Sequence, residues 1–383
     1  MDIKKVTPET IAAQALGWID EATKAVSPPI HMSTTYIRDA DNQYRNGRVY
    51  ARDHNPSFDQ AEAVICALEH GAQAALFASG MAAATAVFLA LKPGDHVIAP
   101  KVMYWSLRNW LLNFATQWGL QVEFIDVHDT FQLTRAMRPG KTKLVWAETP
   151  ANPLWTITDI AATADIAHAA HALLAVDSTA ASPVLTQPLT LGADIVMHSA
   201  TKYLNGHSDI IAGALVTRED SDYWKRVKMI RAQIGGTMGS MEAWLLLRGM
   251  RTLYLRVDAA CRSAQRITEH FQHHPQIAEV LYPGLKSFAG HAVAAKQMRG
   301  GFGGMLSIRI KAGEAAAIAT AANVQLWKRA TSLGGVESLI EHRASVEGAG
   351  TPVPFDLLRL SVGIENADDL INDLEQALKR AAA

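Results

Sequence analysis

Short apolar segments alternate with amphipathic segments from Pro56 to about residue 216, and this alternation most limits what the chain can fold into. Each apolar segment is only a few residues long and is bounded by turn formers, which is typical of a buried strand. The predicted strands lie at 74–78, 96–99, 122–125, 144–147, 173–176, 195–197 and 211–216. The predicted helices between them lie at 58–69, 79–91, 105–118 and 159–171. This order predicts an α/β fold with a mostly parallel sheet that helices cover on both faces.

The alternation does not extend to the N-terminal part of the chain. Residues 1–53 are rich in turn formers and polar side chains, and no sustained periodicity appears after about Lys24. A segment that buries little of itself often lies across a neighbouring subunit. We therefore expect residues 1–53 to form an extended arm that contributes to a neighbouring subunit.

The pattern changes again near Leu253. The residues beyond it predict a long helix at 255–273, a half-buried strand at 305–310 and a final helix that Asn366 caps. These elements predict a smaller C-terminal α+β domain. The expected division is the arm at 1–53, an α/β domain at 54–253 and the α+β domain at 254–383.

The composition argues against several classes of protein. The 36 Lys and Arg residues balance 37 Asp and Glu residues, so we expect no general attraction to nucleic acid or to an anionic membrane. No apolar run approaches the ~18 residues of a membrane span, and residues 1–16 lack the pattern of a signal peptide. Cys66 and Cys261 have no metal-type spacing and are expected in helices as small apolar residues. We expect a cytoplasmic protein without a metal site.

The strongest candidate for chemistry is Lys202, which follows the predicted strand at 195–197. Ser199 and Thr201 place two hydroxyl groups beside it. A lysine at a strand end can form a Schiff base with an aldehyde cofactor, and nearby hydroxyls can hold a phosphate. The alternative is a solvated lysine in a polar loop. The other candidate residues of the chain, described below, favour the first interpretation.

Two other strand ends carry residues that suit such a cofactor. Gly80 and Met81 open a helix whose backbone N–H groups could face a phosphate, although the glycine could instead serve a tight turn. Asp177 ends another strand and could pair with a protonated pyridine nitrogen, cap a helix or bind a metal. Since Asp177 and Lys202 lie about one βαβ unit apart, they could reach one pocket at the carboxyl ends of the strands.

Five further residues have two interpretations each. Tyr104 could stack on a cofactor or fill the core, and Asn152 could contact a ligand or fix a proline-rich turn. Arg359 lies in an apolar, strand-like run, where it could bind a substrate carboxylate or form an internal ion pair. Tyr50 and Arg52 could hold a phosphate in another subunit or lie in a solvated loop.

Together these segments resemble the cystathionine γ-synthase family, the Cys/Met-metabolism branch of the pyridoxal-phosphate enzymes. The resemblance covers nearly the whole chain, from Pro28 to Leu378. It rests on seven motifs, at residues 50–56, 79–83, 148–153, 199–203, 300–304, 332–338 and 359–365. It implies fold type I of these enzymes, the aspartate-aminotransferase-like fold with a seven-stranded sheet. It also implies a homotetramer built from two tight dimers.

The resemblance implies a role for each residue that matches a family motif. Lys202 would form the Schiff base with pyridoxal phosphate and move protons, and Asp177 would bind the ring nitrogen. Tyr104 would stack on the ring and supply a proton to the leaving group. The phosphate would be held by Gly80, Met81, Ser199 and Thr201, joined by Tyr50 and Arg52 of a neighbouring subunit. The substrate carboxylate would be held by Asn152, Ser332 and Arg359.

The reaction that the resemblance implies is elimination or replacement at Cγ of an amino acid, as in cystathionine γ-lyases and γ-synthases. β-Elimination of the cystathionine β-lyase type and γ-replacement on an O-activated homoserine stay open as alternatives. Transamination, racemisation and a non-catalytic regulatory role are further alternatives. The intact set of Lys202, Asp177 and Arg359 argues against the non-catalytic role.

Several positions depart from the family pattern in ways that concern the substrate. Trp105 adds bulk after Tyr104, and the cysteine typical of methionine γ-lyases is absent from this segment. Thr331 stands where many γ-synthases and γ-lyases carry a glutamate suited to the distal amino group of cystathionine. His31 and Arg343 also differ from the usual residues. These departures affect the expected substrate and leave the expected cofactor site unchanged.

Overall fold

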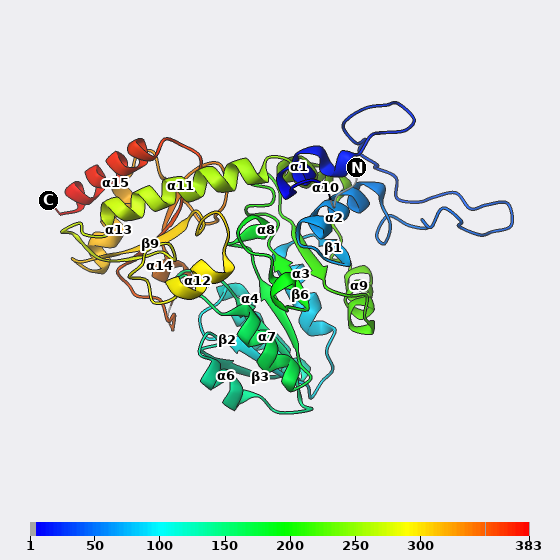
Figure 1. The fold of residues 1–383 in the computed structure, drawn as a ribbon, viewed down its shortest axis with the longest axis horizontal. Helices are drawn as coiled ribbons and strands as arrows, with labels where there is room; N and C mark the ends of the chain where they lie inside the picture. Colours follow the sequence, from blue (N-terminus) through cyan, green and yellow to red (C-terminus); the bar gives the residue numbers. More distant parts are fainter. Residues whose placement is uncertain (1–4, 349, 383) are drawn as a thin grey trace.

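The chain forms two β-sheets, and the larger one has seven strands (Figure 1). The computed structural model describes residues 5–348 and 350–382. The strands of the larger sheet lie in the order β1-β7-β6-β5-β4-β2-β3. Their bounds are Gln73–Phe77 (β1), His96–Pro100 (β2), Gln121–Ile125 (β3), Thr142–Glu148 (β4), Leu173–Asp177 (β5), Ile195–His198 (β6) and Gly213–Thr217 (β7).

The strand directions confirm a mostly parallel sheet. The neighbours among β2 to β6 are parallel, whereas β7 runs antiparallel to both β1 and β6. Each strand predicted from the sequence overlaps an observed strand of this sheet. Because β7 returns antiparallel to β6, the connection at 199–212 stays at the carboxyl end of β6, and this connection carries Lys202.

Helices bury both faces of the larger sheet. Successive strand residues point to opposite faces, and accordingly Val196 belongs to one buried apolar cluster while Met197 belongs to another. The cluster around Val196 includes side chains of α2 (Pro56–Leu68), α7 (Ile160–Ala169) and α10 (Ser240–Met250). The cluster around Met197 includes side chains of α3 (Gly80–Leu89), α4 (Trp105–Trp110) and α9 (Asp222–Ile234).

The remaining segments of this part are short. The helix predicted at 105–118 is present, but after α4 it continues through a π-helical segment, η3, before it ends as α5. The short segments are η3 (Leu111–Ala115), α5 (Thr116–Trp118), α6 (Thr130–Ala136), α8 (Ser182–Leu185) and η4 (Pro188–Leu191).

The smaller sheet has five strands in the order β10-β11-β12-β9-β8. β10 is parallel to β11, and the other neighbours are antiparallel. The strands are Ile277–Leu281 (β8), Met305–Ile310 (β9), Lys328–Arg329 (β10), Leu339–His342 (β11) and Leu357–Ser361 (β12). The helices are α11 (Leu253–Phe271), α12 (His291–Gln297), α13 (Glu314–Asn323), α14 (Arg343–Glu347) and α15 (Ala367–Ala381).

The sequence had predicted the main elements of this smaller part. β9 coincides with the strand predicted at 305–310, and α11 overlaps the helix predicted at 255–273. The side chain of Asn366 accepts a hydrogen bond from the backbone N–H of Asp368, which confirms Asn366 as the N-cap of α15. Leu370, Leu374 and Leu378 of this helix are buried, as its spacing of leucines predicts.

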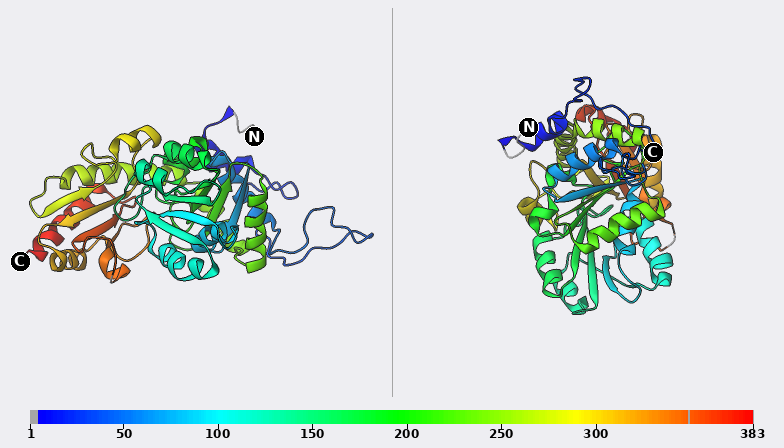
Figure 2. Two further views of the ribbon diagram at one scale, coloured as in Figure 1. Left: turned by 90° about the horizontal axis from the view of Figure 1, so that it is seen from below. Right: turned by 90° about the vertical axis from the view of Figure 1, so that its right-hand side faces the viewer.

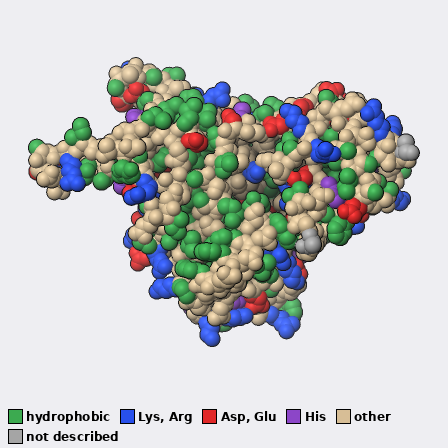
Figure 3. Space-filling model, turned by 180° about the vertical axis from the view of Figure 1, so that it is seen from behind, with side chains coloured by type: hydrophobic (Ala, Val, Ile, Leu, Met, Phe, Trp, Pro, Cys, Tyr) green, Lys and Arg blue, Asp and Glu red, His purple; other side chains and the backbone are tan. Residues whose placement is uncertain are grey.

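The N-terminal residues differ partly from the expected extended arm. Pro8–Gln14 form α1, followed by the short helix η2 (Ala15–Gly17), and α1 buries Ile11 and Ala12 in the core. The chain between η2 and α2 contains no further helix or named strand, and it projects from the body (Figures 2 and 3). It exposes Ile37 and Val26 to solvent at 91% and 75%. Only this later part is therefore extended.

A buried hydrogen-bond chain connects the two sheets. Trp155, in the loop after β4, donates from Nε1 to Ser307 Oγ on β9 over 2.9 Å. Ser307 Oγ in turn donates to the carbonyl oxygen of Pro153 over 2.8 Å. Trp155 and Ser307 are fully buried, so water cannot replace these bonds. Among the described residues, no helix has the length and apolar character required to cross a bilayer.

Candidate active site

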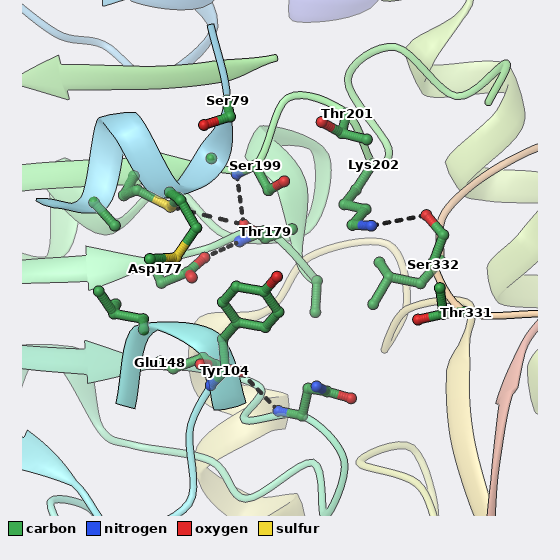
Figure 4. Close-up of a pocket in the computed structure, with 18 of the residues that line it drawn as sticks. Ser79, Tyr104, Glu148, Asp177, Thr179, Ser199, Thr201, Lys202, Thr331 and Ser332 are labelled. Carbon is green, nitrogen blue, oxygen red and sulfur yellow. Dashed lines mark hydrogen bonds between the residues drawn. The ribbon is translucent and has the colours of Figure 1, made fainter. Parts of the chain in front are cut away.

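A pocket of about 320 Å³ lies at the carboxyl ends of β4, β5 and β6, against loops of the smaller sheet (Figure 4). Ligands of open α/β sheets commonly bind beyond the carboxyl ends of the strands. The pocket brings together most of the residues that the sequence predicted for the site. These are Gly80, Met81, Tyr104, Asn152, Asp177, Ser199, Thr201, Lys202, Ser332 and Arg359.

Lys202 extends its side chain from the β6–β7 connection into this pocket (Figure 4). Its Nζ donates a hydrogen bond to Ser332 Oγ over 2.7 Å. Burial, together with the positive charge of Arg359, lowers the pKa of Lys202 to about 8. A much larger fraction of this amine is therefore neutral and nucleophilic at physiological pH than for an exposed lysine.

The N-terminus of α3 and the β6–β7 connection form a narrow cradle in the same pocket. Ser79 is the N-cap of α3, and its Oγ accepts a hydrogen bond from the backbone N–H of Ala82 over 3.0 Å. A Cβ at position 80 would lie only 2.7 Å from Ser199 Oγ, so only glycine allows this approach. Backbone N–H groups and hydroxyls close to a helix N-terminus are suited to an anion such as a phosphate.

Two buried carboxyl groups lie at the ends of adjacent strands. Asp177 ends β5, and its Oδ1 accepts a hydrogen bond from the backbone N–H of Thr179 over 3.0 Å. Glu148 ends β4, and burial together with nearby Asp177 raises its pKa to about 8. Burial also raises the pKa of Asp177, although the hydrogen bonds from Thr179 oppose this effect. A protonated ring nitrogen of a cofactor, placed beside Asp177, would offset the free-energy cost of burying the charge of this carboxylate.

Tyr104 precedes α4 and points its ring into the pocket between Asp177 and Lys202 (Figure 4). Its backbone N–H donates to Glu148 Oε2 over 2.7 Å. The other carboxylate oxygen, Oε1, accepts from the backbone N–H of Asn152 over 2.9 Å. Glu148 therefore fixes the segments that carry Tyr104 and Asn152 relative to each other.

Arg359 approaches the pocket from β12 of the smaller sheet. Its Nη1 donates to Asn152 Oδ1 over 3.1 Å, and its Nη2 donates to the carbonyl oxygen of Ser332 over 2.9 Å. Burial lowers the pKa of Arg359 to about 10, so the guanidinium stays protonated at neutral pH. Ser332 has a φ of 97°, a strained value for a residue other than glycine. The structure thus brings Asn152, Ser332 and Arg359 together as predicted.

Arg359 also forms an internal ion pair, which was one of its two interpretations, and its binding of a substrate carboxylate stays a prediction. Its Nη2 lies 2.6 Å from Glu341 Oε2. Arg343 donates from Nη1 to the same oxygen over 2.9 Å, and from Nη2 to Glu347 Oε1 over 2.8 Å. Arg343 lines the pocket beside Arg359, whereas neither Glu341 nor Glu347 does.

Two of the predicted site residues lie elsewhere. Tyr50 and Arg52 are on the projecting segment and do not line this pocket, and the ring of Tyr50 lies against the guanidinium of Arg52. Their expected place in the site of a neighbouring subunit stays a prediction. His31 and Trp105, which are also within the described part of the chain, do not line the pocket either.

Sequence reasoning did not assign Glu148 or Thr179 to the site, and it named Arg343 only as a departure from the family pattern, although all three line the pocket. Glu148, like Asp177, is a carboxylate at the end of a predicted strand. It lies in the motif at 148–153, from which only Asn152 was predicted as a site residue. Thr179 follows Asp177 by two residues, and its hydroxyl accepts a hydrogen bond from the backbone N–H of Ser199 over 2.8 Å. Within the described residues, no group of three or more His, Cys, Asp and Glu side chains could hold a metal ion.

These features fit one cofactor closely. The buried amine, the carboxyl group at the end of β5, the cradle at α3 and the ring of Tyr104 match the aldehyde, ring nitrogen, phosphate and flat ring of pyridoxal phosphate. The fold and the site therefore define a pyridoxal-phosphate enzyme of fold type I.

Comparison with known proteins identifies the family. Residues 9–379 match the family model of Cys/Met metabolism PLP-dependent enzymes, and the chain belongs to this family. It is 45% identical over 377 residues to the cystathionine gamma-synthase of Mycobacterium tuberculosis, covering 97% of this chain and 96% of that protein. It is 40% identical over 368 residues to the cystathionine gamma-lyase of Bacillus subtilis, covering 94% of this chain and 96% of that protein.

A solved structure supports the same assignment. The chain resembles cystathionine gamma synthase from Xanthomonas oryzae pv. oryzae in complex with aminoacrylate and cysteine, with a TM-score of 0.94 and 38% identity. The match covers 98% of this chain and 99% of that structure. The chain is accordingly a pyridoxal-phosphate-dependent enzyme, and its cystathionine gamma-synthase and gamma-lyase homologues are consistent with elimination or replacement at Cγ.

Proposed function

We propose that this enzyme binds the amino-acid substrate between Lys202 and Arg359 and catalyses elimination or replacement at Cγ. The observation that carries the proposal is the position of Ser332. Its Oγ accepts from Lys202 Nζ over 2.7 Å, and its carbonyl oxygen accepts from Arg359 over 2.9 Å. A proton-moving amine and a carboxylate-binding guanidinium therefore meet at one residue, so an α-amino acid held by its carboxylate would present Cα to the amine.

Pyridoxal phosphate, when bound, supplies an aldehyde that links covalently to amines and a conjugated ring that accepts the electron pair left at Cα. Asp177 would hold the ring nitrogen in its protonated form, and Tyr104 would cover one face of the ring. Gly80, Met81, Ser199 and Thr201 would bind the phosphate. The cradle at position 80 and the carboxyl group that ends β5 support these roles.

Proton movement then falls to Lys202 and Tyr104. The neutral amine of Lys202 would take the proton from Cα. For a substituent at Cγ, it would return this proton to the conjugated system that the cofactor supplies and then take a second proton, from Cβ. The hydroxyl of Tyr104 gives a proton to the departing group. Arg359, Asn152 and Ser332 hold the α-carboxylate, so that the Cα–H bond stays directed toward Lys202.

We also infer a cytoplasmic homotetramer in which Tyr50 and Arg52 reach the phosphate of a neighbouring subunit. The support is the projecting segment, because Val26, Ile37 and Tyr50 are exposed large apolar side chains on it. Large apolar side chains gathered on one exposed segment suit a surface that another chain covers. Cys66 and Cys261 are free thiols in helices, as expected in a reducing compartment.

Mass spectrometry of the products from L-cystathionine tests the reaction, with a panel of γ-substituted amino acids alongside. Cysteine and α-ketobutyrate would support elimination at Cγ, and a new thioether formed from an activated homoserine and a thiol would support replacement. Homocysteine and pyruvate would mean elimination at Cβ and would contradict the proposal. The Lys202→Ala variant provides the blank, because it lacks the amine, and circular dichroism checks that it is folded.

A further inference from the structure

Arg343 is the charged residue of the pocket wall that the proposed reaction leaves without a role. Among the described residues, the Asp, Glu, Lys and Arg side chains that line the pocket are Glu148, Asp177, Lys202, Arg343 and Arg359. Asp177, Lys202 and Arg359 have roles in the proposed reaction, and Glu148 positions Tyr104 and Asn152. A buried arginine is costly unless its charge is used or compensated.

The structure holds Arg343 rigidly at the wall. Its side chain is 5% exposed, and its guanidinium forms ion pairs with Glu341 and Glu347, which do not line the pocket. Glu347 is itself fixed, because its Oε2 accepts from the hydroxyl of Thr351 over 2.6 Å. Burial works to lower the pKa of Arg343, but the hydrogen bonds that it donates to Glu341 and Glu347 raise it, so the guanidinium is always charged.

The terminal nitrogens of this guanidinium keep N–H groups that are not used. Each carries two hydrogens, but among the described residues Nη1 bonds only to Glu341 and Nη2 only to Glu347. Nε makes no hydrogen bond and is closed off from solvent, so the donors within reach of a ligand are those of the terminal nitrogens. Arg343 and Arg359 donate to the same oxygen of Glu341, so their guanidinium groups are neighbours. A substrate whose α-carboxylate occupies Arg359 therefore has a second donor next to its remaining atoms.

We infer that Arg343 is a specificity-determining residue, which binds an acceptor oxygen on the γ-substituent and favours an anionic substituent over a cationic one. Because this assignment requires a γ-substituted amino acid in the pocket, it rests on the proposed function. Thr331 lines the same pocket and brings no negative charge with it. The pocket carboxyl groups, Glu148 and Asp177, end β4 and β5 on the side of the ring. Burial and nearby Asp177 raise the pKa of Glu148 to about 8 despite the opposing charge of Arg343, so Glu148 is mostly neutral at pH 7.

Three thioethers of similar length test this charge preference. They are S-carboxyethyl-, S-butyl- and S-aminopropyl-L-homocysteine, whose substituents end in a carboxylate, a methyl group and an ammonium group. Calorimetry gives the dissociation constant of each with the cofactor-loaded enzyme, and α-ketobutyrate release gives the rate. We expect the carboxylate compound to bind at least tenfold more tightly than the ammonium compound, with the butyl compound between them.

Two variants separate a contact with the substrate from a structural role. The Glu347→Gln variant loses one ion pair but keeps Arg343, so the ratio of dissociation constants should stay within threefold of the wild-type value. The double variant Arg343→Gln, Glu347→Gln removes the guanidinium without leaving Glu347 as an unpaired charge, and the ratio should fall to about one. If the double variant does not fold, Arg343→Lys should retain the preference in reduced form, since lysine keeps the charge but loses the planar donor group.

Equal binding of the three thioethers to the wild-type enzyme would overturn the inference, as would an unchanged ratio in the double variant. Failure of the proposed function has a different signature. In that case no α-ketobutyrate or replacement product forms from any γ-substituted amino acid, including cystathionine. An enzyme that turns over cystathionine but shows no charge preference would therefore refute only the role of Arg343.

Discussion

The two walls of the pocket hold their charged groups by different means. On the ring side, Asp177 and Glu148 end parallel strands and accept hydrogen bonds from backbone N–H groups. On the substrate side, Arg343 and Arg359 are held mainly by side chains, those of Glu341, Glu347 and Asn152. Backbone donors are present whatever the neighbouring residue is, whereas a side-chain partner disappears with one substitution. The ring side is thus fixed by the fold, and the substrate side is open to change.

The largest expected effect belongs to the ring side. Replacing Asp177 with Asn removes the negative charge that would stabilise a protonated ring nitrogen, so kcat should fall roughly a hundred- to a thousandfold with little change in KM. Steady-state kinetics of a fully loaded enzyme measure this. Asp373→Asn is a matched control, because Asp373 is also buried and accepts backbone hydrogen bonds, from Leu326 and Trp327. If Asp177→Asn changed KM more than kcat, the proposed contrast between the two walls of the pocket would be wrong.

On the substrate side, the expected effect is smaller and appears in KM. Arg359→Lys keeps a positive charge but loses the planar donors that reach Asn152 and Ser332. KM should rise roughly ten- to a hundredfold, with a smaller change in kcat. Arg309→Lys is the control, since Arg309 lies in the same sheet and pairs with Asp356 away from the pocket. If Arg359→Lys lowers kcat alone, the residue does not hold the substrate as proposed.

Lys202 lies between the two walls. Its lowered pKa should make the rate of pyridoxal phosphate capture change about tenfold with pH. In the cofactor-free enzyme the amine has a pKa of about 8 instead of 10.5, and only its neutral form attacks an aldehyde. The rate constant for capture of pyridoxal phosphate should therefore rise about tenfold from pH 7 and level off above pH 8–9. Stopped-flow absorbance measures this rate. A rate that continues to rise through pH 10 would show that burial does not lower the pKa.

Two helix caps give the smallest effect and separate stability from function. Ser79→Ala and Asn366→Ala each remove a side-chain acceptor at the start of a helix, so each should lower the free energy of unfolding by about 1 kcal/mol. Denaturant unfolding measures both. Only Ser79 lies at the pocket, so Ser79→Ala alone should also weaken the binding of pyridoxal phosphate. Equal affinity for pyridoxal phosphate in the two variants would show that Ser79 does not help to bind the phosphate.

The same contrast explains what the sequence could predict. Residues at strand ends were identifiable, because the apolar segments locate the strands and their carboxyl ends share one edge of the sheet. This accounts for Asp177, Lys202 and Tyr104. The antiparallel direction of β7 was not predictable, since a buried strand is equally apolar in either direction. α1 was missed because its single short apolar face gives little periodicity.

The substrate side was less accessible to sequence reasoning. Arg343 stood out only as a departure from a family pattern, with no indication that it reaches the pocket. Its position depends on Glu341 and Glu347, and contacts between side chains are not encoded in any spacing that a single sequence reveals. Arg359 was identified because buried arginines are rare, and this left two interpretations open. The structure shows the ion pair with Glu341, and the binding of a substrate carboxylate stays a prediction.

The buried link from Trp155 through Ser307 to Pro153 limits how this enzyme can move. Opening the pocket by rotating one sheet away from the other would break both hydrogen bonds where no water can enter. Each orphaned group would cost roughly 1–3 kcal/mol, so such a hinge motion would be rare. Admission of substrate and release of product should therefore rely on local rearrangement of exposed loops, and turnover should not depend on a large domain closure.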